Sequence, residues 1–146
     1  MKKIKDNRSV FEEFLLGVCT CGIYYIWYQD RMVCDINEML ADDGKKTENF
    51  PMRLVWTLLT CTLYDFVWRY RLAARLNDAL KKRNAPYSLS GVGQTVLGLL
   101  GRENPLFFFI ADHKLIKATN QLAKIHNKSQ YEGEDDLEDQ PFDLEQ

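Results

Sequence analysis

Three of the four cysteines lie within a few residues of two similar motifs. Cys19 and Cys21 are two residues apart, and Cys61 lies forty residues after Cys21. Three thiolates could contribute to a structural zinc site, which takes four Cys or His ligands. The chain has no Cys-x-x-Cys pair, and both histidines lie in its last third. We therefore expect no metal and interpret these cysteines as small apolar residues beside a helix break.

Basic side chains recur just beyond three apolar runs, at Arg31, Arg71 and Lys114. They could hold a phosphate or an anionic lipid headgroup. Alternatively, their aliphatic stems lie on apolar surface while the charges reach water or headgroups. The segment 69–83 adds six basic residues against one acid, which favours attraction to an anionic membrane surface. Aromatic residues lie in apolar runs rather than between these cations, so we expect no nucleic-acid partner. The candidate lipid or partner contacts are Arg31, Arg69, Arg71, Arg75 and Lys114.

Four polar residues are candidates for buried positions: Asn37, Asp65, Asn77 and Asn120. The asparagines could line a pore, or they could form hydrogen bonds between packed units, since a buried amide needs partners. An acid in an apolar run is costly, which makes Asp65 a functional candidate. Arg69, four residues later, could instead pair with it on a helix.

The sequence offers no recognisable catalytic set. It has no glycine-rich phosphate loop, no supported Ser/His/Asp or Cys/His arrangement, and no paired carboxylates on a cleft-forming element. We expect a protein that is not an enzyme and has no cofactor.

These candidate residues recur because the surrounding sequence recurs. Thr20-Cys-Gly-Ile-Tyr-Tyr-Ile-Trp-Tyr28 resembles Thr60-Cys-Thr-Leu-Tyr-Asp-Phe-Val-Trp68, and each copy continues to an arginine and an asparagine. A weaker third copy, forty-three residues further on, has Glu103-Asn-Pro105 at the break. Such coincidences at fixed offsets indicate an internal duplication. Apolar residues at every fourth position predict one face of a helix in each of the first two copies: Tyr24, Tyr28, Met32, Ile36, Leu40, and Tyr64, Trp68, Leu72, Leu76, Leu80.

We therefore predict an all-α fold of three pseudo-repeated helix–break–helix units, forming a small membrane-associated helical bundle. A basic segment covers residues 1–8 and a helical repeat domain covers 9–128, with copies at about 9–44, 51–84 and 90–127. The last helix should end near residue 126 or 127. The acidic tail, 129–146, should be disordered because it has little apolar area to bury. Residues 131–146 hold eight acids and no Lys or Arg, so residues 1–130 carry a net charge of +6 while the whole chain has −2.

The uncharged run from Phe14 to Tyr28 is a marginal membrane segment. Its fifteen residues would cover only ~22 Å as a straight helix, against a hydrocarbon core of ~30 Å. It ends in tyrosines and a tryptophan, which concentrate at membrane interfaces. Transmembrane, re-entrant and interfacial placements all remain open. Basic residues flank every apolar segment on both sides, which favours shallow hairpins with the breaks at their tips.

The residues Arg8-Ser-Val, Leu-Leu-Gly-Val-Cys-Thr-Cys-Gly-Ile-Tyr-Tyr-Ile-Trp-Tyr and the later Ile-Asn resemble domain of unknown function 4234. That family comprises small, mainly bacterial proteins usually described as membrane proteins. The resemblance covers roughly residues 8–125 and is strongest in the first copy. The second copy departs from the pattern at Thr62 and Asp65. The resemblance implies a location at the bacterial cytoplasmic membrane and no catalytic residues.

The sequence thus favours a non-catalytic membrane protein that binds anionic lipid or partner proteins. Two alternatives remain open: an oligomeric transporter or channel component with Asp65 and the asparagines as its lining, and a soluble helical interaction domain. The expected partners are membrane lipids, and a protein partner or a homo-oligomer is a further alternative.

Overall fold

The computed structural model describes the backbone of residues 3–138 and the side chains of residues 3–131, and every regular element in this range is helical. The elements are α1 (Val10–Cys19), α2 (Ile23–Met39), the short 3-10 helix η1 (Ala41–Asp43), α3 (Phe50–Leu59), α4 (Leu63–Lys82), α5 (Gly91–Glu103) and α6 (Pro105–Glu138). The predicted all-α class is confirmed.

Each short helix is followed, after a break, by a longer one, and the breaks fall where the sequence predicts them. The first two breaks have the same backbone path. Cys21 has φ of 51° and Gly22 has 87°, while Cys61 has 49° and Thr62 has 72°. Positive φ suits glycine and strains residues with a Cβ. The second break therefore stores strain at Thr62 that the first avoids with Gly22.

A side-chain oxygen supports the backbone at each break. The hydroxyl of Thr20 donates to the carbonyl of Leu16 at 2.7 Å and accepts from the backbone N–H of Tyr24 at 2.9 Å. Thr60 makes the equivalent two bonds, at 2.7 and 3.0 Å. At the third break the side-chain oxygen of Asn104 accepts from the N–H of Leu106 at 3.0 Å. These bonds satisfy backbone groups that a helix end leaves unpaired.

The apolar stripes predicted on the two long helices form the hydrophobic core. Met32, Ile36, Leu72, Leu76 and Leu80 are fully buried. They pack against α6 through a third set of apolar residues, which consists of Leu115, Ile116, Ala118, Leu122 and Ala123. Burying side chains of this kind stabilises a fold by about 1.5–3 kcal/mol each. This core occupies the half of the long helices that is remote from the breaks.

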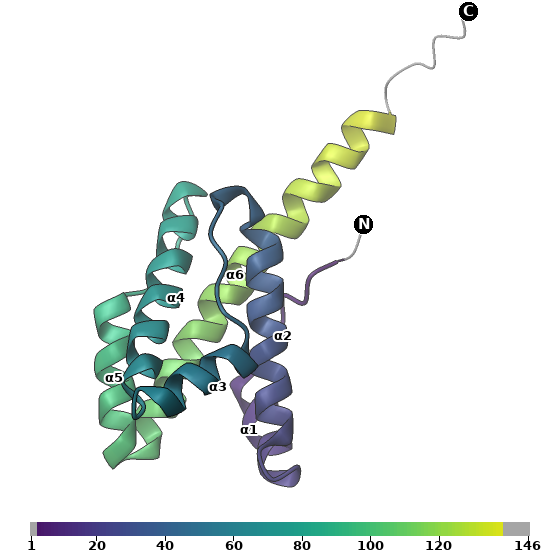
Figure 1. The fold of residues 1–146 in the computed structure, drawn as a ribbon. Helices are drawn as coiled ribbons and strands as arrows, with labels where there is room; N and C mark the ends of the chain where they lie inside the picture. Colours follow the sequence, from purple (N-terminus) through teal and green to yellow (C-terminus); the bar gives the residue numbers. More distant parts are fainter. Residues whose placement is uncertain (1–2, 139–146) are drawn as a thin grey trace, which may run out of the picture.

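Figure 1 shows that the three breaks lie toward one end of the molecule, at the bottom of the view. The short helices α1, α3 and α5 lie in this lower half, and the long helices α2, α4 and α6 continue from it into the upper half. α6 packs against both α2 and α4. The lower half therefore contains six helical segments, whereas the upper half is built from the three long helices and the loops that cross them.

The expected end of the last helix is wrong. α6 continues to Glu138 rather than ending near residue 126 or 127, so residues 129–138 are helical in the structure. This stretch contains one glutamine and three glutamates, which propagate a helix at little cost without burying apolar surface, alongside Gly133 and two aspartates, which favour a helix less. The rest of the predicted tail, residues 139–146, lies outside the described residues. Among the described helices, none combines the length and apolar character that crossing a membrane requires.

Candidate functional site

Large apolar side chains cover the outside of the lower half of the molecule. They come from the three short helices and from the first turns of the long ones. We call this surface the apolar layer, and it consists of Phe11, Phe14, Leu15, Leu16, Val18, Ile23, Ile26, Trp27, Met52, Leu54, Val55, Trp56, Leu58, Leu59, Leu63, Val67, Tyr70, Val92, Val96, Leu99, Leu100, Leu106, Phe109 and Ile110, each at least 36% exposed. A single soluble chain rarely exposes so many large apolar side chains in one half of the molecule unless it binds something there.

Polar side chains occupy the interior of the same half. Each unit contributes one residue from its short helix and one from its long helix, and none of these residues is more than 7% exposed. We call this group the polar core, and it consists of Glu13, Gln29, Arg53, Arg69, Gln94 and Asp112. The lower half thus has polar groups inside and apolar groups outside, the reverse of the upper half.

Hydrogen bonds and ion pairs connect most of the polar core. Arg69 donates to Asp112 at 3.0 Å and to Asp65 at 3.3 Å, so it joins α4 to α6. Arg53 donates through Nε to Asp65 at 2.8 Å and makes a second, very short contact through Nη2. Its guanidinium also lies 3.9 Å from the ring centroid of Trp68.

Glu13 and Gln94 complete the polar core through amide contacts. The side-chain amide of Gln29 donates to Glu13 at 2.7 Å, and the amide of Gln94 donates to the carbonyl of Ala111 at 3.1 Å. Glu13 therefore makes its hydrogen bond to a neutral partner, whereas the two aspartates face guanidiniums.

The environment shifts the pKa values of the three acids in different directions. Burial, together with the nearby Asp112 carboxylate, raises the pKa of Glu13 to about 8. Burial also raises the pKa of Asp112, although Arg69 opposes this. Burial acts on Asp65 in the same sense, but Arg53 and Arg69 outweigh it, so its pKa is lowered. Charge is thus stabilised at Asp65 and is disfavoured at Glu13.

The three predicted asparagines each hold the extended segment that leads into a short helix. Asn37 accepts from the N–H of Thr47 and donates to its carbonyl, both at 2.8 Å. Asn120 makes the same pair of bonds with Arg8, at 3.1 and 2.8 Å, and Asn77 accepts from the N–H of residue 89 at 3.0 Å. Asn37 thus links the first helix pair to the second, Asn77 links the second to the third, and Asn120 links the third to the first. These are hydrogen bonds between packed units of the kind that the sequence predicts, although all three asparagines are half-buried rather than buried.

Residues 8–78 match the family described as Domain of unknown function (DUF4234). Over this segment, the chain resembles DUF4234. No curated protein and no solved structure matches the chain. The DUF4234 segment includes the first two short helices and most of α4. It ends before Gln94 and Asp112, so the polar core is built partly from the DUF4234 segment and partly from the chain that follows it.

Two of the predicted lipid or partner contacts are wrong. Arg69 and Arg75 are 3% and 9% exposed. Arg69 belongs to the polar core. Arg75 lies under the loop that follows α2, where it donates to Asp43 at 2.7 and 3.0 Å and to the carbonyl of Lys45 at 2.6 Å. Both guanidiniums are therefore engaged by the protein. The remaining candidates, Arg31, Arg71 and Lys114, are exposed.

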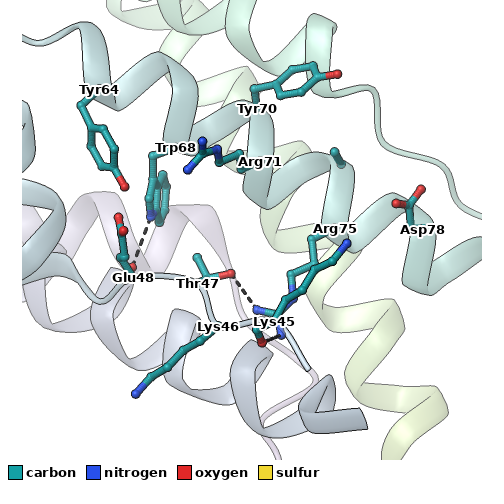
Figure 2. Close-up of a pocket in the computed structure, with 11 residues that line it drawn as sticks. Lys45, Lys46, Thr47, Glu48, Tyr64, Trp68, Tyr70, Arg71, Arg75 and Asp78 are labelled. Carbon is teal, nitrogen blue, oxygen red and sulfur yellow. Dashed lines mark hydrogen bonds between the residues drawn. The ribbon is translucent and has the colours of Figure 1, made fainter. Parts of the chain in front are cut away.

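Arg71 borders a groove of about 300 Å³ between α4 and the loop 45–48. Figure 2 shows Arg71 extending from α4 beside Trp68, with Lys46 reaching away from the loop on the other side. The indole N–H of Trp68 donates to the carbonyl of Glu48 at 3.2 Å, which ties the loop to the helix. The groove therefore combines exposed cations with aromatic rings next to the apolar layer.

Cys19, Cys21 and Cys61 are exposed at the first two breaks, and Cys34 is partly buried. No group of three or more His, Cys, Asp or Glu side chains capable of holding a metal ion occurs among the described residues. The first two breaks therefore present thiols on the apolar layer rather than ligands gathered in a cluster.

Most of the polar core was not predicted from the sequence. Glu13, Gln29, Arg53, Gln94 and Asp112 were missed because a polar or charged side chain in an amphipathic segment is ordinarily placed on the solvent side. A signal was present, since residues 29, 69 and 112 share the offsets of forty and forty-three that relate the three copies. The predicted pairing of Asp65 with Arg69, by contrast, is confirmed.

Proposed function

We propose that the protein is a non-catalytic membrane protein that inserts its three helix pairs, breaks first, into one leaflet of an anionic membrane. The observation that carries this proposal is the reversed polarity of the lower half, with apolar side chains outside and a paired polar core inside. Hydrocarbon favours this arrangement, because charged groups there must face the protein interior and pair with one another.

The dimensions of the short helices support insertion into a single leaflet. α1 and α3 have ten residues each, so each is ~15 Å long. This equals about half of the ~30 Å hydrocarbon core of a bilayer. Helix pairs of this depth would reach toward the middle of the membrane and return to the same side.

The backbone at the first two breaks also suits an environment without water, where unpaired backbone groups are costly. At the first break the N–H groups of Cys21, Gly22 and Ile23 all donate to carbonyls within the hairpin, at 3.3, 2.7 and 3.1 Å. At the second break the N–H groups of residues 61–63 donate to the equivalent carbonyls, at 3.4, 2.7 and 3.1 Å.

The third break is more polar. Arg102 and Glu103 are exposed beside it. Arg102 lies 5.2 Å from the ring centroid of Phe66 and contacts the hydroxyl of Thr62, so it is held against the second helix pair. A charged tip is expensive in hydrocarbon.

Exposed cations are placed where lipid headgroups would lie. Arg31 and Arg71 are eight residues beyond the first residue of their helices, which corresponds to ~12 Å of rise. Lys114 occupies a similar level on α6. Cations at this height would meet phosphates while the layer below them contacts acyl chains. The groove beside Arg71 provides a recess of about 300 Å³ next to one of these cations.

We also propose that the three helix pairs are copies of one duplicated unit. Residues 31–40 and 71–80 have the same pattern of buried and exposed positions. The three asparagines perform one task, and equivalent positions on the long helices supply Gln29, Arg69 and Asp112 to the polar core. The match to DUF4234 covers the first two of these pairs.

Vesicle flotation tests the proposal. The full-length protein should float with vesicles of phosphatidylcholine and phosphatidylglycerol, remain with them after an alkaline wash, and float less with phosphatidylcholine alone. A protein that stays at the bottom of the gradient with both lipids would contradict insertion. Self-association in that sample, measured by sedimentation, would then identify the apolar layer as a contact between copies.

A transporter or channel has less support from the geometry. Asp65 is held by two arginines and the asparagines hold loops, so the side chains that such a lining would need are occupied.

A further inference from the structure

A second cavity, of about 230 Å³, lies in the lower half between α1, α2 and the junction of α5 with α6. Its walls are mainly apolar, and three polar side chains also line it. The lining residues are Val10, Glu13, Phe14, Tyr25, Gly101, Pro105, Phe108, Phe109 and Asp112. None of the candidate lipid contacts borders it, so this cavity is separate from the groove beside Arg71.

One polar group in the cavity lacks a partner. The hydroxyl oxygen of Tyr25 is buried and forms no hydrogen bond. A buried hydroxyl without a partner costs about 1–3 kcal/mol. No group among the described residues satisfies this hydroxyl. A polar group that entered the cavity could form a hydrogen bond with it and so remove the energetic cost.

Charge balance indicates what that polar group would be. Arg53 and Arg69 match Asp65 and Asp112 in number, and these four residues are joined by ion pairs. Glu13 is not part of this balance, because its hydrogen bond comes from the neutral amide of Gln29. Ionised Glu13 would therefore leave one negative charge without a counterion. A single cation in the cavity would provide it.

We propose that this cavity binds a small hydrophobic amine, with its ammonium group between Glu13, Tyr25 and Asp112 and its hydrocarbon part among the phenylalanines. The ammonium donates to the two carboxylates and to the Tyr25 oxygen. An engineered cavity of about 150 Å³ accommodates benzene, so about 230 Å³ suits an amine with six or seven carbon atoms. Phe14 and Phe109 also belong to the apolar layer. The inference does not rest on the membrane proposal, because Glu13 and Asp112, which would hold the ammonium, are buried inside the fold.

Binding should be linked to the release of a proton. Burial and the nearby Asp112 carboxylate together raise the pKa of Glu13 to about 8 in the empty cavity. Glu13 is therefore largely protonated at pH 7. It loses its proton to the solvent as the ammonium enters, and the ammonium keeps its own three protons. The charged and titratable groups that face Glu13 are Asp112 on α6, Arg69 on α4 and the tyrosines Tyr25 and Tyr28 on α2, and Glu12 is next to it on α1.

The test is calorimetric titration of the full-length protein with n-hexylamine, n-hexanol and hexanoate. The protein is titrated in phosphatidylcholine nanodiscs if it floats with vesicles and in buffer if it does not. The heat measured with empty nanodiscs is subtracted. We expect hexylamine to bind more tightly than hexanol by between about ten- and a hundredfold, the value of a charged hydrogen bond, and hexanoate not to bind. Titrations at pH 7 in two buffers of different ionisation enthalpy should show that close to one proton is released. At pH 9.5 the release should be absent.

Variants locate the site. Glu13→Gln keeps a hydrogen-bonding group next to Gln29 but removes the charge, so it should abolish both the preference for the amine and the proton release. Tyr25→Phe should weaken hexylamine binding without lowering the stability of the free protein, because the hydroxyl has no partner to lose. Glu12→Gln is the matched control, since Glu12 lies outside the cavity and contacts Lys5.

Equal binding of amine and alcohol by the wild type would overturn the proposal, and this comparison needs no variant to fold. Amine binding that survives Glu13→Gln, or that Glu12→Gln removes equally, would overturn it as well.

Discussion

Replacing Leu58 and Leu59 with serine should release the protein from vesicles while leaving it folded. These residues end α3 and are 72% and 70% exposed, so they contribute little to packing within the chain. Fully burying a leucine side chain is worth about 1.5–3 kcal/mol. With about 70% of each side chain still to be buried, the pair should contribute roughly 2–4 kcal/mol to insertion. The partition coefficient should fall between about 30-fold and 1,000-fold.

The assay is flotation across a lipid titration, together with urea unfolding in the absence of lipid. Leu58→Ile with Leu59→Ile is the matched control, because it preserves the apolar area and should retain partitioning within about twofold. The reasoning is refuted if the serine variant partitions like the wild type. It is also refuted if the urea midpoint falls substantially, because the two side chains would then be packed rather than free to enter a membrane.

Three further predictions concern the polar core and the loop clamps. Asp65→Asn should destabilise the fold by about 2–4 kcal/mol in urea unfolding, because it leaves Arg53 and Arg69 buried with less countercharge. Because the pKa of Glu13 is raised, the folded state binds more protons than the unfolded state between pH 4.5 and about 8. The contribution of Glu13 to the free energy of unfolding is therefore full below pH 4.5 and is lost as the pH rises toward 8. Glu13→Gln should remove this part of the pH dependence when urea midpoints are compared from pH 4 to 9. Asn120→Ala should cost about 1–3 kcal/mol and should speed amide hydrogen exchange in residues 3–9, because it removes two bonds to that segment.

Each of these predictions has an internal comparison. Asp78→Asn, on the exposed face of α4, should change stability much less than the change at Asp65. If the urea midpoints of the wild type and of Glu13→Gln change with pH in the same way, Glu13 does not titrate between its ordinary range and pH 8. Faster exchange throughout the protein after the change at Asn120, rather than in residues 3–9, would show that the residue stabilises the whole fold instead of one segment.

The sequence predicts the helices well because the signals for them are local. Apolar residues at every fourth position identified Met32 and Leu76 as core, and the Thr-Cys motifs located the breaks. The pairing of Asp65 with Arg69 could also be predicted, because residues four apart on a helix are neighbours. These features depend only on helix geometry.

The interior of the lower half could not be predicted because its contacts join distant segments. Arg69 meets Asp112 forty-three residues away, and the loop that buries Arg75 follows a different helix. A charged residue in an amphipathic helix was placed on the outside by default. That default fails where the outside of the protein is apolar, as it is around Glu13.

The depth of the cysteines at the first two breaks tests the central claim most directly. Single-cysteine variants that retain Cys21, Cys61 or the partly buried Cys34 can carry an environment-sensitive fluorophore in vesicles containing nitroxide lipids. If the breaks insert into one leaflet, nitroxides deep in the acyl chains should strongly quench a fluorophore at Cys21 or Cys61. A fluorophore at Cys34 should be quenched only by headgroup nitroxides. Reagents added outside intact cells should not label Cys21 or Cys61. Quenching of Cys21 and Cys61 by a water-soluble quencher alone, or strong labelling of either from the outside, would contradict it.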